Sequence, residues 1–204
     1  MLMLKRDYWF PNMEEKVKRV INNCIRCVLA EKKKGKGEGV LYPMEKRAVP
    51  LDTYHVDHLG PMSPTKKFYN HIFMIIDAFT KLSWLYPTKT TTTEETLSKL
   101  KLQALTFGNP RRIVSDRGSA FTSNTFKEYC QEENIEHILI TKGIPRGNGQ
   151  VERMNETIVP VLTLKLSISN PAEWWTHVGR VQQIINASHN RSIKKAPFEL
   201  LIGE

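Results

Sequence analysis

An unbroken apolar run at residues 72–76 constrains the fold more than any other feature of the sequence. The run Ile-Phe-Met-Ile-Ile contains no polar side chain, so a strand formed here is buried on both of its faces. At 204 residues the chain is long enough to bury one sizeable core. The sequence therefore predicts a sheet with covering elements on each side.

Four further strands surround this run. We expect them at residues 51–59, 82–86, 112–115 and 135–140, with the second of these stopped by Pro87. The helix after Pro87 is predicted from a capping box, Thr92 with Glu95, and from Gly108 as its end. Its expected apolar face comprises Leu97, Leu100, Ala104 and Phe107.

Three more helices are predicted further along, one of which carries Glu152. One is marked by Phe126, Tyr129 and Cys130, and another begins at residues 170–171, where Asn-Pro is typical of a helix start. The buried stripe of the last helix is expected to comprise Trp174, Val178, Val181 and Ile185. Three strands, a helix, a strand, a helix, a strand and final helices predict an α/β fold, a mixed five-stranded sheet flanked by helices.

The first fifty residues differ in character from the rest. A small helix is expected at residues 11–24, capped by Asn12, with Met13, Val17, Val20, Ile21 and Cys24 at helical spacing. Residues 30–49 form a basic, glycine-rich linker, which is either a solvated tether or one that also touches phosphates. The net charge of +9 favours a polyanion as partner.

Membrane and secreted classes are disfavoured. No apolar run is long enough to span a bilayer, and no signal peptide is visible. Three cysteines cannot all pair, and Cys24 and Cys27 are too close in sequence to suggest a disulfide scaffold. We therefore expect an intracellular protein.

Three acidic residues stand in distinctive settings. Asp57 lies within an apolar strand, Asp116 follows a strand at a glycine-containing turn, and Glu152 enters a helix through a glycine-rich loop. Singly, Asp116 reads as a turn residue and Glu152 as favourable charge at a helix N-terminus. Together, three carboxylates from distant segments predict a Mg²⁺ site suited to phosphoryl transfer on nucleic acid.

The surrounding motifs make the chain recognisable. The core, residues 50–204, resembles the catalytic core of retroviral and gypsy-type LTR retrotransposon integrases, which are parts of Pol polyproteins. The motifs that carry the resemblance lie at residues 54–61, 76–81, 113–122, 147–155 and 197–203. The resemblance implies a ribonuclease H-like fold and Asp57, Asp116 and Glu152 as catalytic ligands of Mg²⁺ or Mn²⁺. It also implies 3′-end processing and strand transfer of element DNA into target DNA, in a homo-oligomer acting in the nucleus.

The N-terminal segment, residues 1–29, resembles the second half of the integrase zinc-binding domain. Tyr-Trp-Phe-Pro at residues 8–11 and the pair Cys24 and Cys27 carry this resemblance. Zinc takes four ligands, and no His precedes Cys24. We therefore expect a vestigial half-site without zinc, with a truncated fragment as the alternative. The family would also continue into a C-terminal DNA-binding domain.

Residues around Glu152 are candidate DNA contacts, with solvated surface as the alternative interpretation. They are Arg146, Asn148, Gln150, Arg153, Asn155 and, further along, Lys165. Trp174 and Trp175 suggest base stacking, but helical spacing favours core packing for Trp174. Asp77 is expected to be structural.

The leading function hypothesis is a metal-dependent polynucleotidyl transferase. The alternatives are a catalytically inactive, domesticated or truncated nucleic-acid-binding module and a plain nuclease of the same fold.

Overall fold

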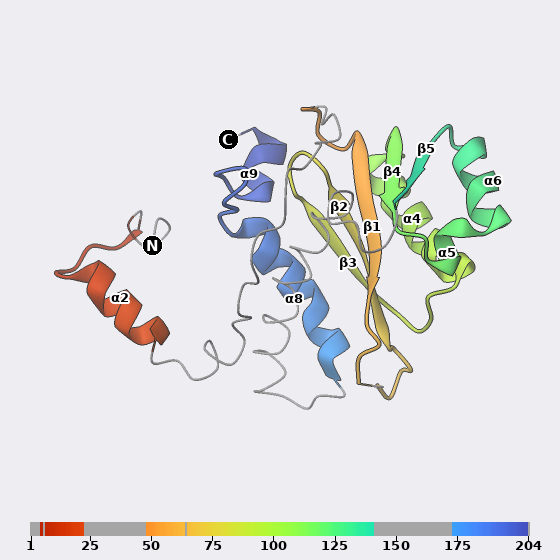
Figure 1. The fold of residues 1–204 in the computed structure, drawn as a ribbon. Helices are drawn as coiled ribbons and strands as arrows, with labels where there is room; N and C mark the ends of the chain where they lie inside the picture. Colours follow the sequence, from red (N-terminus) through yellow and green to blue (C-terminus); the bar gives the residue numbers. More distant parts are fainter. Residues whose placement is uncertain (1–4, 6, 23–47, 64, 141–172, 204) are drawn as a thin grey trace.

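A five-stranded mixed sheet forms the centre of the molecule (Figure 1). The computed structural model describes residues 5, 7–22, 48–63, 65–140 and 173–203. The strands are β1 (Thr53–Leu59), β2 (His71–Asp77), β3 (Ser83–Thr88), β4 (Arg112–Ser115) and β5 (Glu136–Leu139), in the spatial order β3-β2-β1-β4-β5. β1, β2 and β3 are antiparallel neighbours, whereas β4 runs parallel to β1 and β5 parallel to β4. The predicted mixed five-stranded α/β fold is confirmed.

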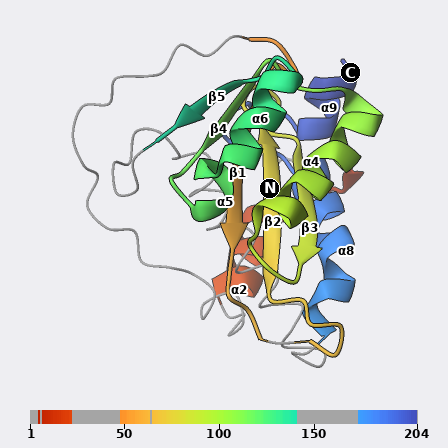
Figure 2. The same ribbon diagram turned by 90° about the vertical axis from the view of Figure 1, so that its right-hand side faces the viewer.

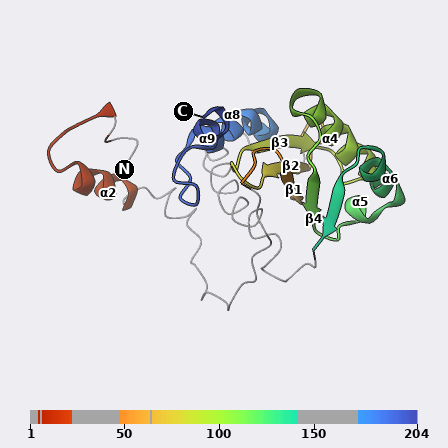
Figure 3. The same ribbon diagram turned by 90° about the horizontal axis from the view of Figure 1, so that it is seen from above.

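Helices cover the sheet on both faces. One face carries α4 (Thr93–Phe107), α5 (Ser119–Thr122) and α6 (Asn124–Glu132), which lie in front of the strands in Figure 2. On the other face α8 (Trp174–Ala187) packs along β3 and is followed by α9 (Pro197–Ile202), as the view from above shows (Figure 3). A separate helix, α2 (Met13–Asn22), lies in the N-terminal segment, where Val20 is 71% exposed rather than on a buried face.

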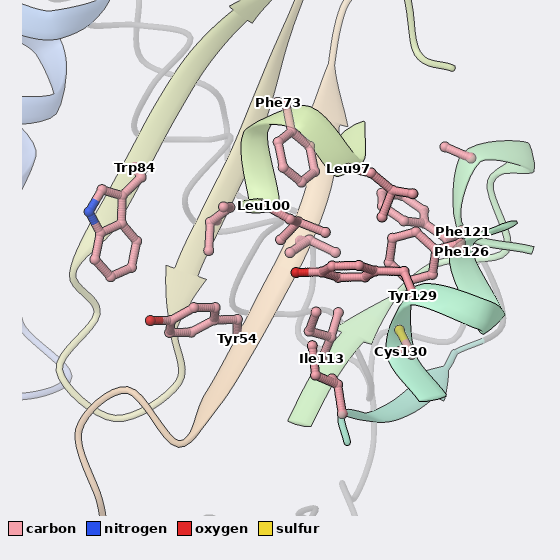
Figure 4. Packing of buried hydrophobic residues seen from close by; sticks show 14 of the residues in the cluster. Tyr54, Phe73, Trp84, Leu97, Leu100, Ile113, Phe121, Phe126, Tyr129 and Cys130 are labelled. Carbon is pink, nitrogen blue, oxygen red and sulfur yellow. The ribbon is translucent and has the colours of Figure 1, made fainter. Parts of the chain in front are cut away.

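The strand with the apolar run is buried on both faces, as predicted. Phe73 and Ile75 belong to a cluster with Leu97, Leu100 and the aromatic residues of α5 and α6 (Figure 4). The alternate residues of β2 belong to the cluster on the α8 side, which comprises Ile72, Met74, Ile76, Leu85, Trp174, Val178, Val181 and Ile185. Trp174 is fully buried and donates its indole N–H to the Ser63 carbonyl at 2.8 Å, so the core interpretation of this residue is confirmed.

The prediction that Pro87 stops the third strand was wrong, because β3 continues to Thr88. β3 is an edge strand, and its residues 83, 85 and 87 point their backbone nitrogens away from β2. The N–H groups of Ser83 and Leu85 donate instead to Asn186 (2.9 Å) and Gln182 (2.8 Å) of α8. Pro87 takes the third such position, where the missing N–H breaks no sheet hydrogen bond.

The start of α4 differs in one detail from a capping box. Thr92 is the N-cap, and its hydroxyl accepts from the Glu95 N–H at 3.4 Å, as expected. The Glu95 carboxylate, however, accepts from the backbone N–H groups of Lys89 (2.9 Å) and Thr90 (2.8 Å). It therefore holds the incoming loop between β3 and α4 rather than the cap itself. Gly108 ends the helix, as predicted.

Candidate active site

Asp57 is placed by the pairing of β1 with β2. It lies opposite Met74, so its side chain is on the sheet face that α8 covers, while His58 points to the face covered by α4. Asp57 is half-buried, and its Oδ1 accepts the backbone N–H of His58 at 2.7 Å. β1 thus presents a carboxylate on the α8-covered face of the sheet, two residues after the buried His55 on the same face.

Asp116 is brought to the same place by the parallel pairing of β1 with β4. The register aligns Thr53 with Arg112 and His55 with Val114. Continuing this register by two residues would pair Asp57 with Asp116, which directly follows Ser115 at the end of β4, on strands about 4.8 Å apart. The parallel pairing therefore brings the segments that carry the two predicted ligands side by side, although 58 residues separate Asp57 and Asp116 in sequence.

The turn after β4 orients Asp116. Its Oδ1 accepts the backbone N–H of Gly118 at 2.8 Å, which folds the side chain back over the turn. A Cβ at Gly118 would lie 3.0 Å from the same oxygen and 3.4 Å from the Phe121 ring. Glycine at this position thus lets the backbone approach the carboxylate closely. The short helix α5 that begins at Ser119 was not predicted.

His58 supports the site from the opposite face of the sheet. Its ring packs against those of Phe73 (5.0 Å) and Phe121 (5.4 Å), and its Nε2 is 3.2 Å from the Thr96 hydroxyl. That hydroxyl donates to the Thr92 carbonyl (2.8 Å), so the imidazole Nε2–H is the donor to Thr96. Burial, with a contribution from His71, lowers the pKa of His58 to about 4, against the opposing effect of Asp116. His58 is therefore neutral at pH 7 and ties β1 to α4.

A second histidine supports Asp116 from β5. The buried Ser115 hydroxyl donates to the Asp116 carbonyl at 3.0 Å and lies 2.9 Å from His137 Nε2. Because the hydroxyl proton is engaged, His137 Nε2–H is the donor in the second bond. Burial lowers the pKa of His137 as well. Sequence reasoning missed both histidines, since only the tertiary pairing of β4 with β5 brings His137 beside Ser115.

Asp77 has the structural surroundings expected for it. The residue is fully buried, and its carboxylate accepts the N–H groups of Leu51 (3.0 Å) and Thr80 (2.7 Å) and the Thr80 hydroxyl (2.6 Å). Burial raises the pKa of Asp77, against the opposing effect of these bonds. It fastens the turn after β2 to the start of β1.

The other predicted site residues lie outside the described residues. They are Glu152, the candidate DNA contacts Arg146, Asn148, Gln150, Arg153, Asn155 and Lys165, and the cysteines Cys24 and Cys27. Within the described part of the chain, no cluster of three His, Cys, Asp or Glu side chains could hold a metal ion. Asp57 and Asp116 nevertheless fit Mg²⁺ chemically, because this ion binds through one or two carboxylates and retains several waters.

The family follows from comparison with known proteins. Residues 48–145 match the family model of the integrase core domain, and residues 1–33 match that of the integrase zinc binding domain. These two stretches therefore belong to the integrase core and integrase zinc binding domain families.

Its relatives are viral and transposon polyproteins. The chain is 34% identical over 202 residues to the Pro-Pol polyprotein of simian foamy virus type 3, covering 99% of the chain and 17% of the polyprotein. It is 28% identical over 202 residues to the transposon Tf2-3 polyprotein of Schizosaccharomyces pombe, covering 98% of the chain and 15% of that polyprotein. The chain thus spans less than a fifth of the length of these relatives.

Solved structures confirm the ribonuclease H-like fold. The catalytic core domain of HTLV-2 integrase, in a trimeric form with magnesium, superposes with a TM-score of 0.61 at 23% identity, covering 74% of this chain and 97% of that one. The simian T-cell lymphotropic virus intasome in complex with PP2A regulatory subunit B56 gamma gives a TM-score of 0.68 at 20% identity, covering 91% and 66%.

Proposed function

We propose that this chain carries out DNA integration as a metal-dependent polynucleotidyl transferase, through 3′-end processing and strand transfer of retroelement DNA. The observation that carries the proposal is the parallel pairing of β1, which contains Asp57, with β4, which ends directly before Asp116. Glu152 would complete the ligand set for Mg²⁺ or Mn²⁺. The relation to integrases of the gypsy type, as well as of retroviruses, is part of the same proposal.

In this proposal two aspartates bind the metal, and a backbone group orients one of them. Asp57 and Asp116 supply hard oxygen ligands, and the Gly118 N–H holds one Asp116 oxygen in a defined direction. Bound Mg²⁺ supplies activation of an attacking oxygen and stabilisation of the leaving oxygen. The nucleophile is water in end processing and a DNA 3′-hydroxyl in strand transfer. No protein base is needed, which agrees with the neutral, hydrogen-bonded state of His58.

The partners follow from the same proposal. DNA would contact Arg146, Asn148, Gln150, Arg153, Asn155 and Lys165, and the basic linker at residues 30–49 would add contacts to phosphates. A homo-oligomer is supported by the dimeric and trimeric forms of the HTLV-2 core. We expect nuclear action on chromosomal DNA. None of the described helices has the length and apolarity needed to cross a bilayer.

Zinc stays a separate expectation. The match to the zinc binding domain model covers Cys24 and Cys27, but two cysteines supply only half of a tetrahedral site. We therefore expect less than stoichiometric zinc in the purified chain, as measured by elemental analysis.

A strand-transfer assay on element-end DNA tests the function. We expect activity with Mg²⁺ or Mn²⁺, and a loss of about a thousandfold in Asp116→Asn, because a catalytic metal contributes several kcal/mol to the transition state. The matched control is Glu128→Gln, which removes a carboxylate from the exposed surface of α6. Mn²⁺ binding, followed by electron paramagnetic resonance, should weaken in Asp116→Asn and not in the control.

The same measurements distinguish the proposed function from the alternative. If the wild-type chain folds and binds DNA but neither binds Mn²⁺ nor transfers strands, the chain is a non-catalytic nucleic-acid-binding module.

A further inference from the structure

The connection between β1 and β2 ends in a tight turn that presents an aromatic side chain to solvent. The backbone N–H of Phe68 donates to the Thr65 carbonyl at 2.9 Å, and that of Tyr69 donates to the Thr65 hydroxyl at 2.9 Å. Phe68 is 73% exposed and has φ = +63°, a left-handed conformation that is costly for a bulky residue. We call residues 65–69 the hairpin tip. Because most of the Phe68 side chain is exposed, burial in the core does not explain why a phenylalanine occupies this position.

Positive charge flanks this aromatic side chain. Lys66 and Lys67 are both exposed, and the Lys67 ammonium lies 4.3 Å from the ring centroid of Trp175 on α8. The Trp175 ring also contacts Tyr69, at 5.7 Å between centroids. The hairpin tip is thus fastened to α8 through Lys67 and Tyr69, and it also carries the exposed Lys66 and the exposed ring of Phe68.

The hairpin tip lies at the end of the sheet where the two carboxylates are. Asp57 lies two residues, or about 7 Å, before Leu59 at the end of β1, and the chain reaches the hairpin tip six residues after Leu59. Asp116 lies at the same end, because β4 is parallel to β1. Figure 1 shows the β1–β2 connection beside the first turn of α8. A nucleic acid held at the carboxylates would extend over this end of the sheet.

We propose that the hairpin tip binds DNA next to the reacting end, with Phe68 stacked on an unpaired base and Lys66 and Lys67 contacting phosphates. This inference rests on the proposed function and names a further part of its DNA interface. Aromatic rings bind bases of any sequence by stacking, and flanking cations follow the backbone. A protein partner would not account for the two adjacent lysines, Lys66 and Lys67, beside the exposed ring, so the combination favours nucleic acid.

The test measures DNA affinity without turnover. Fluorescence anisotropy in Ca²⁺ compares a blunt duplex with the same duplex carrying a short single-stranded overhang. The test variants are Phe68→Ala and the double variant Lys66→Ala with Lys67→Ala. The controls are Phe198→Ala, an exposed aromatic residue on α9, and the pair Lys101→Ala with Lys127→Ala, exposed lysines on α4 and α6.

Phe68→Ala should weaken binding of the overhang DNA about tenfold and that of the blunt DNA less than twofold. The Lys66 and Lys67 double variant should weaken both and lower the slope of log affinity against log salt by roughly 1.5. Both controls should stay within twofold of wild type. Phe68→Gly separates folding from binding, because glycine accepts the positive φ and should be at least as thermally stable as Phe68→Ala with the same loss of affinity.

Wild-type affinity of the hairpin variants for both DNAs would overturn the inference, as would equal losses on blunt and overhang DNA in Phe68→Ala. The two proposals fail separately. Hairpin variants that bind normally in a transfer-active protein refute only the hairpin contact, whereas a wild-type chain without transfer activity refutes only the proposed function.

Discussion

Replacing Asn186 by alanine should destabilise the core strongly, because one side chain of α8 satisfies two backbone groups of the edge strand β3. Asn186 is 2% exposed; its Oδ1 accepts the Ser83 N–H at 2.9 Å, and its Nδ2 donates to the Ser83 carbonyl at 2.8 Å. In Asn186→Ala both backbone groups lose this partner in a buried environment. Each such loss costs about 1–3 kcal/mol. Alanine is the better helix former by roughly 0.5 kcal/mol, which offsets a small part.

We therefore expect a decrease of about 2–5 kcal/mol in the free energy of unfolding. For a chain of this length the midpoint of thermal unfolding should fall by about 5–15 °C. Urea unfolding followed by tryptophan fluorescence measures the change, and the slope against urea should stay constant. Gln183→Ala is the matched control, because Gln183 lies on the exposed side of the same helix. Its substitution should change stability by less than about 0.5 kcal/mol.

A loss below about 1 kcal/mol in Asn186→Ala would refute the reasoning. It would mean that water replaces the amide at Ser83, and that α8 is held to β3 by apolar packing alone.

Two further predictions concern ionisable groups in the core. Burial lowers the pKa of His58 to about 4, so the unfolded chain takes up a proton at higher pH than the folded protein does. The metal-free protein should therefore lose at most about 3 kcal/mol of unfolding free energy as the pH falls from about 6.5 to 4. His58→Gln should lack this loss in urea titrations across the same pH range. Burial raises the pKa of the Cys130 thiol to about 11, so a thiol reagent at pH 8 should modify Cys130 only after unfolding, and mass mapping that finds rapid native-state labelling would contradict its buried environment.

Local patterns were sufficient for most of the regular structure. Three such patterns depend only on residues within one segment: the apolar run at residues 72–76, the helix cap at Thr92 and the apolar stripe from Trp174 to Ile185. Pro87 was misread for the same reason. Whether a proline breaks a strand depends on which way its nitrogen points, and only the edge position of β3 settles that.

The sequence by itself indicated Asp57 and Asp116 as candidate ligands, because a carboxylate within an apolar strand and another at a glycine-containing turn can be recognised without the fold. It also determined the two-sided burial of β2. The tertiary structure alone decided that the segments carrying Asp57 and Asp116 lie side by side, since this depends on the parallel pairing of β1 with β4. It likewise decided the supporting roles of His58, His137 and Asn186. Their partners lie in other elements, up to 103 residues away for Asn186 and Ser83, and no local pattern encodes such pairings.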